Sequence, residues 1–238
     1  MTAAPPGVPP VLAEGDLELL GLLPRSSNYA FLARVTRGAE EMLAVYKPRR
    51  GETPLWDFPE GTLGNREAAA FALAHALGWP NVPPTLLRDG PEGEGAVQRF
   101  IPFEPSEHAL TLLERLPGTF RRIALFDVVV NNADRKAGHC LLGRDGDVFV
   151  VDHGTCFSDE PKLRTVLWDY VDEPIPPGEG EDLRALSGAL RAGPVRDALD
   201  ALLSPGEVRA TIARLDELLA DGRFPPPGPG RPYPWPIV

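Results

Sequence analysis

The sequence has little cysteine and no long apolar segment. Its two cysteines, Cys140 and Cys156, are too few for a disulfide framework, which is typical of a protein in a reducing compartment. No apolar run is long enough to span a bilayer, and the first residues, MTAAPPGVPP, lack the basic and apolar regions of a signal peptide. We therefore predict a cytoplasmic protein with no integral membrane segment.

The sequence also lacks a run of lysine and arginine that is typical of a surface for the nucleic-acid backbone. The chain has 24 lysine and arginine residues against 34 acidic residues, which gives a net charge of −10. A protein that grips nucleic acid needs a basic patch to neutralise the phosphates. We therefore exclude nucleic acid as a partner. The 238 residues, 43% of them hydrophobic, are sufficient for a substantial buried core.

Lysine is scarce relative to arginine. There are only three lysines, Lys47, Lys136 and Lys162, beside 21 arginines. This bias suggests that arginine has replaced lysine wherever either residue serves. A lysine that persists is then a candidate for a position where a compact ammonium is needed. All three lie in or just after the motifs described below.

The most informative stretch runs from residue 126 to residue 157, FDVVVNNADRKAGHCLLGRDGDVFVVDHGTCF. It predicts a helix end, a polar loop and a hairpin of strands 140–142 and 148–151, with a turn that contains Gly146. The hairpin returns the chain, so that Asp134 in the loop and Asp152 at the strand end can face one pocket. Two converging aspartates at a strand end are typical of phosphoryl-transfer sites, where they hold Mg²⁺ and orient a hydroxyl.

The N-terminal half predicts two pairs of strands, residues 29–35 with 42–46 and residues 82–87 with 96–100. Residues 11–23 predict one short amphipathic element. Small polar residues before the first strand, Ser26, Ser27 and Asn28, could present backbone N–H groups to phosphates. Lys47 ends the second strand, where a solvated edge charge is the ordinary interpretation and a contact to a nucleotide phosphate is the functional one.

A helix is predicted between the two pairs of strands. Asn65 is its expected N-cap and Gly78 its end. Glu67 lies in its first turn, where it could simply complement the helix dipole. The functional alternative is an ion pair between Glu67 and Lys47.

The rest of the chain is predicted to be mostly helical. Helices are expected at residues 119–130, 183–190, 194–203 and 205–219, with a Pro/Gly-rich linker at 173–182. We divide the chain into a disordered tail (1–10), an N-lobe (11–103), a C-lobe (104–224) and a Pro-rich tail (225–238). The last segment is expected to be extended and to pack back onto the fold through Tyr233 and Trp235.

Four segments resemble the phosphatidylinositol 3-/4-kinase-like families, especially the type II phosphatidylinositol 4-kinases. SSNYAFLARV…AVYKP resembles their nucleotide-binding start, AVQRFIP their adenine-side hinge, NNADRKAGHCLL their catalytic loop and VFVVDHG their metal-binding motif. The chain is also similar to HipA-like serine/threonine kinases, and as a whole to an actinobacterial family distantly related to these kinases. The resemblance implies an α+β, two-lobed protein-kinase-like fold, with a β-rich N-lobe that has one main helix and a mostly helical C-lobe.

The resemblance also implies roles for particular residues. Lys47 would bind phosphate with Glu67 as its partner, Asp134 would receive or orient the acceptor hydroxyl, and Asp152 would be the main Mg²⁺ ligand. Adenine would contact the backbone of Gln98, Arg99, Phe100 and Ile101. The activity implied is ATP-dependent transfer of the γ-phosphoryl group to a hydroxyl acceptor.

Three departures from the family pattern qualify these roles. His139 occupies a position where these families carry a metal-binding asparagine, so that Mn²⁺ or a single metal ion is an alternative to the usual Mg²⁺. Lys136 stands where lipid kinases carry histidine and where protein kinases often carry a lysine that contacts the transferred phosphate. In the segment 155–174 that follows Gly154, Lys162 and Arg164 are the only clustered cations, which favours a protein or small-molecule acceptor over an inositol lipid.

Three other readings remain open at this point. An ATP-binding pseudokinase would keep the fold without turnover, and an AMP transferase would use the same fold with inverted nucleotide. A zinc site is the third reading, and its ligands would be His139, Cys140, His153 and Cys156. Adjacent residues on a strand point to opposite faces, however, which disfavours tetrahedral convergence.

Overall fold

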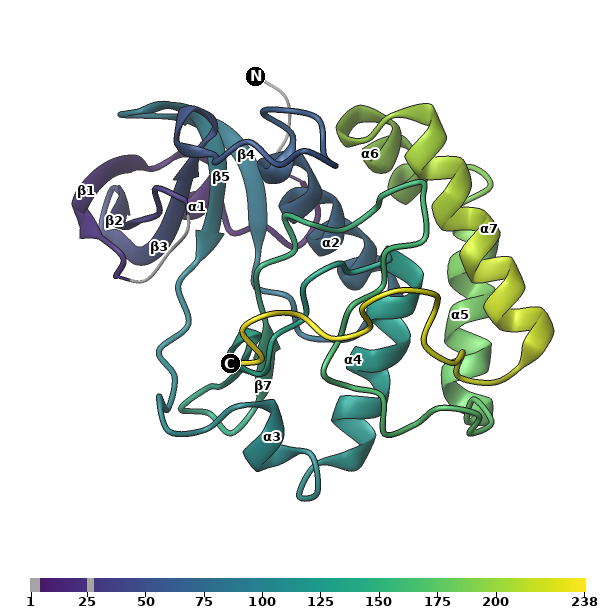
Figure 1. The fold of residues 1–238 in the computed structure, drawn as a ribbon. Coiled ribbons are helices and arrows are strands. Elements are labelled where there is room, and N and C mark those ends of the chain that lie inside the picture. The colour runs from purple at the N-terminus through teal and green to yellow at the C-terminus, as the bar shows by residue number, and fades with distance from the viewer. Residues whose placement is uncertain (1–4, 25–27) are drawn as a thin grey trace.

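The computed structural model of this protein describes residues 5–24 and 28–238. Ser26 and Ser27, two residues of the predicted phosphate turn, lie outside the described residues. Figure 1 shows an antiparallel sheet at one end of the molecule, a long helix α2 beside it, and further helices packed around α4 at the other end. One continuous apolar core runs from the sheet through α2 into the C-terminal helices.

Within the described residues, the N-terminal half forms an antiparallel sheet with the strand order β1-β2-β3-β5-β4. Its strands are β1 (Asp16–Leu22), β2 (Phe31–Arg37), β3 (Glu40–Pro48), β4 (Thr85–Gly90) and β5 (Gly93–Arg99). The two predicted pairs correspond to β2–β3 and β4–β5. The 3₁₀ turn η1 (Arg49–Gly51) follows β3.

The single element predicted over residues 11–23 is wrong. Gly15 divides this segment into the short helix α1 (Pro10–Glu14) and strand β1. A Cβ atom at Gly15 would lie 2.6 Å from the carbonyl oxygen of Val11 and 2.7 Å from that of Thr36. Only glycine therefore permits this close approach of the turn to β2.

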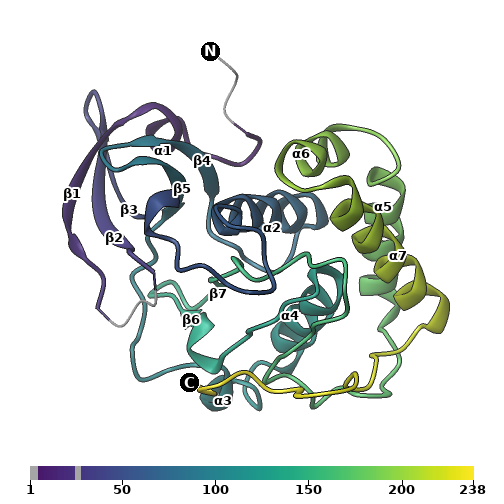
Figure 2. The same ribbon diagram turned by 45° about the horizontal axis from the view of Figure 1, so that its top comes forward.

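Helix α2 (Leu63–Leu77) lies between the sheet and the C-terminal helices, as both views show (Figures 1 and 2). It ends as predicted, because Gly78 adopts a left-handed conformation with φ 85°. The predicted N-cap is wrong: the helix begins two residues before Asn65. The Asn65 side chain instead donates a hydrogen bond to the carbonyl of Leu202 (3.0 Å) in α6.

The C-terminal half consists of helices around a small hairpin. The helical elements are α3 (Ala109–Leu112), α4 (Pro117–Val130), the 3₁₀ turn η2 (Ala137–His139), α5 (Pro177–Ala189), α6 (Pro194–Leu202) and α7 (Pro205–Asp221). The hairpin pairs β6 (Cys140–Leu142) with β7 (Val148–Val150). Helix α5 begins inside the segment predicted as a linker, because proline at a helix start costs no hydrogen bond. The lobe boundaries predicted at residues 103 and 224 stay predictions.

A buried ion pair holds α2 against the C-terminal helices. The Arg66 side chain is 1% exposed, and its guanidinium bonds the Glu207 carboxylate of α7 and donates to the Cys156 carbonyl (2.6 Å). Glu207 also accepts a hydrogen bond from the amide of Ser204 (2.8 Å), which completes a capping box at the start of α7. The helix next to the sheet is thereby fixed to the C-terminal half.

The predicted N-terminal tail differs from expectation where the structure describes it, and the C-terminal segment differs only in the groups that anchor it. Val8 is buried in the core and Pro10 begins α1, so this part of the predicted N-terminal tail is packed. The C-terminal segment is irregular and packs back, but through the carbonyls of Pro232 and Ile237. Tyr233 and Trp235, which were expected to anchor it, are instead exposed.

The Arg66–Glu207 pair yields a stability prediction. Arg66→Ala should lower the free energy of unfolding by about 3–5 kcal/mol, because it leaves a buried carboxylate without its partner. Arg34→Ala is the matched control, since Arg34 pairs with Glu18 at the surface (side chains 39% and 66% exposed), and it should cost less than about 1 kcal/mol. Urea unfolding measures the free energy of unfolding of both variants. Equal losses of stability in the two variants would contradict a stabilising role for the buried pair.

Candidate active site

Lys47 is positioned by the alternation of strand β3. Ala44 and Tyr46 point into the core, so the following residue faces the opposite side of the sheet. Its Nζ lies 2.5 Å from Oε1 of Glu67 on α2 and 3.3 Å from Oδ1 of Asp152 after β7. One ammonium therefore joins three segments that are far apart in the sequence.

Glu67 is a buried carboxylate with both oxygens engaged. Its side chain is 3% exposed; Oε1 accepts from Lys47, and Oε2 accepts from the backbone N–H of His153 (3.2 Å). A buried carboxylate is tolerated when it is paired in this way. Burial alone would lower the pKa of Lys47, but attraction to Glu67 and Asp152 outweighs it and raises that pKa above its usual value. Lys47 is therefore fully charged at neutral pH.

Asp152 lies at the point where the chain leaves β7. It adopts a left-handed conformation (φ 63°), which aspartate tolerates better than most residues. Its side chain is 51% exposed, with Oδ1 toward Lys47 and Oδ2 3.2 Å from Nε2 of His139. The Lys47 ammonium holds the pKa of Asp152 well below its usual range, against the opposing effect of burial. Asp152 thus presents a permanent, accessible negative charge.

His139 is the second side chain at this carboxylate. Burial lowers the pKa of His139 to about 4, so its imidazole is neutral at pH 7. Its Nδ1 accepts a long hydrogen bond from the Lys136 amide (3.4 Å), which favours a proton on Nε2. A metal ion on Nε2 would require the proton to be on Nδ1. Nδ1 could then no longer accept the weak hydrogen bond from the Lys136 amide.

Asp134 lies on the loop between α4 and η2. Its amide donates to Oδ1 of Asn132 (3.0 Å), which fixes the turn, and its carboxylate lies 2.9 Å from Nζ of Lys136. Burial raises the pKa of Asp134, while the neighbouring charge of Lys136 opposes this rise. Asp134 lines a cavity of about 180 Å³ together with Lys47, Glu67 and Asp152. The Lys47 ammonium and the carboxylates of Glu67, Asp134 and Asp152 therefore share one cavity.

A buried network behind the cavity was not found from the sequence. Arg135 donates through Nε and Nη2 to Asp127 (2.9–3.1 Å) and through Nη1 to the Val151 carbonyl (2.9 Å). Its Nη2 also lies 2.8 Å from Nε2 of His153. Because Arg135 follows Asp134 and His153 follows Asp152, this network fixes the two aspartates relative to each other. The one local signal in the sequence was that Asp127 and Arg135 stand close to strongly apolar segments, where a charged residue needs a buried partner.

The remaining predicted nucleotide contacts are divided. Asn28 lines the cavity and accepts a hydrogen bond from the Thr53 amide (2.7 Å). The hinge segment does not line it. Gln98 is paired with Val45 of β3 and Thr85 of β4. The Arg99 amide donates to the Pro84 carbonyl and the Phe100 amide to the Leu43 carbonyl (both 2.9 Å). Of this segment, Ile101 has an amide without a backbone partner in the described part of the chain.

The zinc interpretation is wrong. In residues 5–24 and 28–238, no group of three or more His, Cys, Asp or Glu side chains could hold a metal ion. Nε2 of His153 already contacts the Arg135 guanidinium (2.8 Å). Burial raises the pKa of Cys140 to about 12, so that its thiol stays protonated and is a poor metal ligand. None of the described helices is long and apolar enough to cross a membrane.

Comparison with solved structures defines the class of fold. The proinflammatory kinase CtkA of Helicobacter pylori matches with a TM-score of 0.56 and 13% identity, over 89% of this chain and 94% of that chain. The hydra Fam20 structure with sugar matches with a TM-score of 0.58 and 14% identity, over 89% and 86%. The predicted α+β, two-lobed kinase-like fold is confirmed.

Comparison of sequences defines the family. No family model matches the sequence. Protein Rv2133c of Mycobacterium tuberculosis is 38% identical over 263 residues, which cover 95% of this chain and 94% of that protein. The chain therefore belongs to the same family as Protein Rv2133c.

Two plant proteins are more distant relatives. Phosphatidylinositol 4-kinase gamma 4 of Oryza sativa subsp. japonica is 30% identical over 56% of this chain, and phosphatidylinositol 4-kinase gamma 8 of Arabidopsis thaliana is 27% identical over 76%. The matches span 26% and 42% of those longer proteins. They support the kinase-like character of the fold.

The Lys47–Glu67 pair should behave as an energetically coupled unit. Lys47→Met leaves the buried Glu67 carboxylate unpaired and should destabilise the protein, whereas adding Glu67→Gln should restore part of the loss. A double-mutant cycle measured by urea unfolding should give a coupling energy of roughly 1–3 kcal/mol. Additive effects of the two substitutions would mean that the pair is not formed in solution.

Proposed function

We propose that this protein is an ATP-dependent phosphotransferase that transfers the γ-phosphoryl group to a hydroxyl acceptor. The observation that carries the proposal is the Lys47 ammonium between Glu67 and Asp152, in one cavity with Asp134. Phosphoryl transfer is catalysed mainly by positioning and by electrostatic stabilisation of the phosphates. A fixed ammonium opposite an exposed carboxylate supports this chemistry on a kinase-like fold.

Each residue has a distinct role in this proposal. Lys47, oriented by Glu67, binds the phosphates, with backbone groups of residues 26–28 as further contacts. Asp134 accepts a hydrogen bond from the acceptor hydroxyl and orients it; burial raises its pKa in the direction of a better base. Lys136, 2.9 Å from Asp134, contacts the transferred phosphoryl group. Adenine would lie outside this cavity, beside the segment 98–101, where the Ile101 amide is the available donor.

The donor set fits a divalent metal ion. Asp152 has an accessible, permanently ionised carboxylate, and the neutral His139 ring lies beside it. Such a metal ion, when bound, would be held by Asp152 with His139 beside it and would neutralise part of the negative charge of the phosphates. Carboxylate oxygen suits Mg²⁺, whereas an imidazole ligand favours Mn²⁺. A protein or small-molecule acceptor is favoured over an inositol lipid.

The decisive experiment combines nucleotide binding with turnover. ATP with Mg²⁺ or Mn²⁺ should raise the melting temperature, and Asp152→Asn should abolish the metal-dependent part of this shift. Asp134→Asn should keep the shift but lower turnover by at least about 100-fold, because proton transfer in such reactions contributes about 10²–10⁴-fold. Asp147→Asn, in the exposed hairpin turn, is the matched control and should change neither quantity.

The alternative functions give different outcomes in the same assay. Stabilisation by ATP without turnover would identify a pseudokinase, and a protein-bound AMP adduct detected by mass spectrometry would identify an AMP transferase. The absence of any nucleotide-dependent shift in either metal would contradict nucleotide binding at this cavity.

A further inference from the structure

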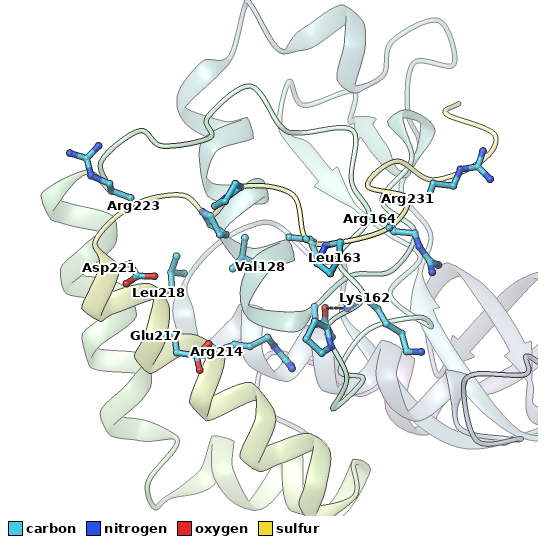
Figure 3. Close-up of a pocket in the computed structure, with 17 residues that line it drawn as sticks. Val128, Lys162, Leu163, Arg164, Arg214, Glu217, Leu218, Asp221, Arg223 and Arg231 are labelled. Atoms are coloured by element: carbon cyan, nitrogen blue, oxygen red, sulfur yellow. Dashed lines mark hydrogen bonds between the residues drawn. The ribbon is translucent and has the colours of Figure 1, made fainter.

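A second cavity, of about 350 Å³, lies on the C-terminal side of the catalytic loop. It is bounded by residues 161–164, by the C-terminal part of α7, and by the segment 223–231 that follows this helix (Figure 3). Its size is within the range that accommodates a small molecule. Although the protein has a net charge of −10, five of the seven charged residues that line this cavity are cationic.

Backbone hydrogen bonds join this cavity to the catalytic loop. The Arg164 amide donates to the Asn132 carbonyl (2.9 Å), and the Arg135 amide donates to the Arg164 carbonyl (3.0 Å). The C-terminal segment is held on the other side, where its Pro232 carbonyl accepts from the Thr165 amide (3.1 Å). The loop with Asp134, the strand-like segment with Arg164 and the tail with Arg231 therefore lie side by side.

Three of the five cations already have partners. The Lys162 ammonium pairs with Asp57 and Glu160, and the Arg223 guanidinium donates to the Asp172 carbonyl. The Arg214 guanidinium donates to the carbonyls of Val129 and Ser158 and to the Thr211 hydroxyl. These three side chains have structural roles.

Arg164 and Arg231 differ from these three. Across the part of the chain that the structure describes, neither guanidinium has a carboxylate or hydrogen-bond partner. The Arg231 guanidinium lies 5.5 Å from the ring centroid of Trp235, and Figure 3 shows both arginines at the same end of the cavity. Burial raises the pKa of Asp134, and the positive charge of Arg164 is one of the charges that oppose this rise. Arg164 is therefore close enough to Asp134 to act on its carboxylate electrostatically.

We propose that Arg164 and Arg231 form an anion-binding subsite for the acceptor, and that this acceptor is a small molecule with a phosphate group in addition to its reactive hydroxyl. The assignment to the acceptor depends on the proposed phosphotransferase function. A phosphate monoester offers three free oxygens and up to two negative charges to two guanidinium groups, whereas a carboxylate offers two oxygens and one charge. Phosphate is therefore favoured over carboxylate.

The opposite end of the cavity limits the rest of the ligand. Glu217 and Asp221 of α7 lie there, away from Arg164 and Arg231 (Figure 3). These carboxylates would repel a second anionic group but can accept hydrogen bonds from hydroxyls. The subsite therefore favours a monophosphate over a bisphosphate, and the reactive hydroxyl of this ligand extends from Arg164 toward Asp134, away from these carboxylates.

Binding measured without nucleotide tests this subsite independently of turnover. Isothermal titration calorimetry on the full chain uses glycerol 3-phosphate, glycerate, glycerol and fructose 1,6-bisphosphate as probes. We expect glycerol 3-phosphate to bind more tightly than the other three. Arg231→Gln and Arg164→Gln should each weaken its binding by about tenfold, the effect of losing a hydrogen bond to a charged group. Arg209→Gln, an exposed arginine elsewhere on α7, is the matched control and should leave binding unchanged.

Several results would overturn the subsite: no binding of glycerol 3-phosphate, equal binding of glycerate or of the bisphosphate, or affinity that is insensitive to both arginines. Binding to phosphatidic acid vesicles without binding of the soluble probe would replace the small acceptor with a lipid surface. Arginine-dependent binding in a protein that shows no ATP turnover would retain the anion site and contradict only the proposed reaction.

Discussion

The position of the Lys47 ammonium is the constraint on which the site depends. It lies between a carboxylate of α2 and a carboxylate at the end of β7, so that sheet, helix and hairpin must be correctly placed at the same time. Its two partners are not equivalent. Glu67 is buried and fully hydrogen-bonded, whereas Asp152 is half-exposed to the cavity. The first orients the lysine, and the second remains accessible to a ligand.

Two buried arginines fix the parts that the lysine joins. Arg66 ties α2 to α7, and the neighbouring residue on the same helix is Glu67. Arg135 ties Asp127 to the chain after β7, and it is flanked by Asp134. In both cases the buried residue is adjacent in sequence to one that faces the cavity. Removing a buried charged partner is costly, so this arrangement couples the stability of the fold to the geometry of the site.

Local patterns were sufficient to predict much of the fold. Runs of β-branched and aromatic residues located β2 and β3, and Gly78 was correctly predicted as the end of α2. The division of residues 11–23 into α1 and β1 was not predictable, because it depends on the approach of Gly15 to a carbonyl of β2. The burial of Arg66 and Glu207 was not predictable either, because the two residues are 141 positions apart. A charged residue on a helix ordinarily faces solvent, and it is buried only where a partner is available.

The candidate site was predictable in part for a related reason. Lys47, Asp134 and Asp152 stand at ends of local elements, where their spacing and the family resemblance are informative. The cavity they share with Glu67 is described by the structure, whereas their catalytic roles stay predictions. Arg231 could not be connected with the site from sequence, because only the hydrogen bonds of the C-terminal segment bring it beside Arg164.

The scarcity of lysine permits a direct measurement of the central claim. An ATP derivative with an acyl phosphate transfers its acyl group to a lysine amine next to the bound phosphates, and mass spectrometry identifies the acylated residue. Three lysines compete, of which Lys47 lines the cavity and Lys162 is paired with Asp57 outside it. We predict acylation of Lys47 that excess ATP suppresses. Acylation of Lys162 alone, or labelling of Lys47 that ATP does not suppress, would contradict it.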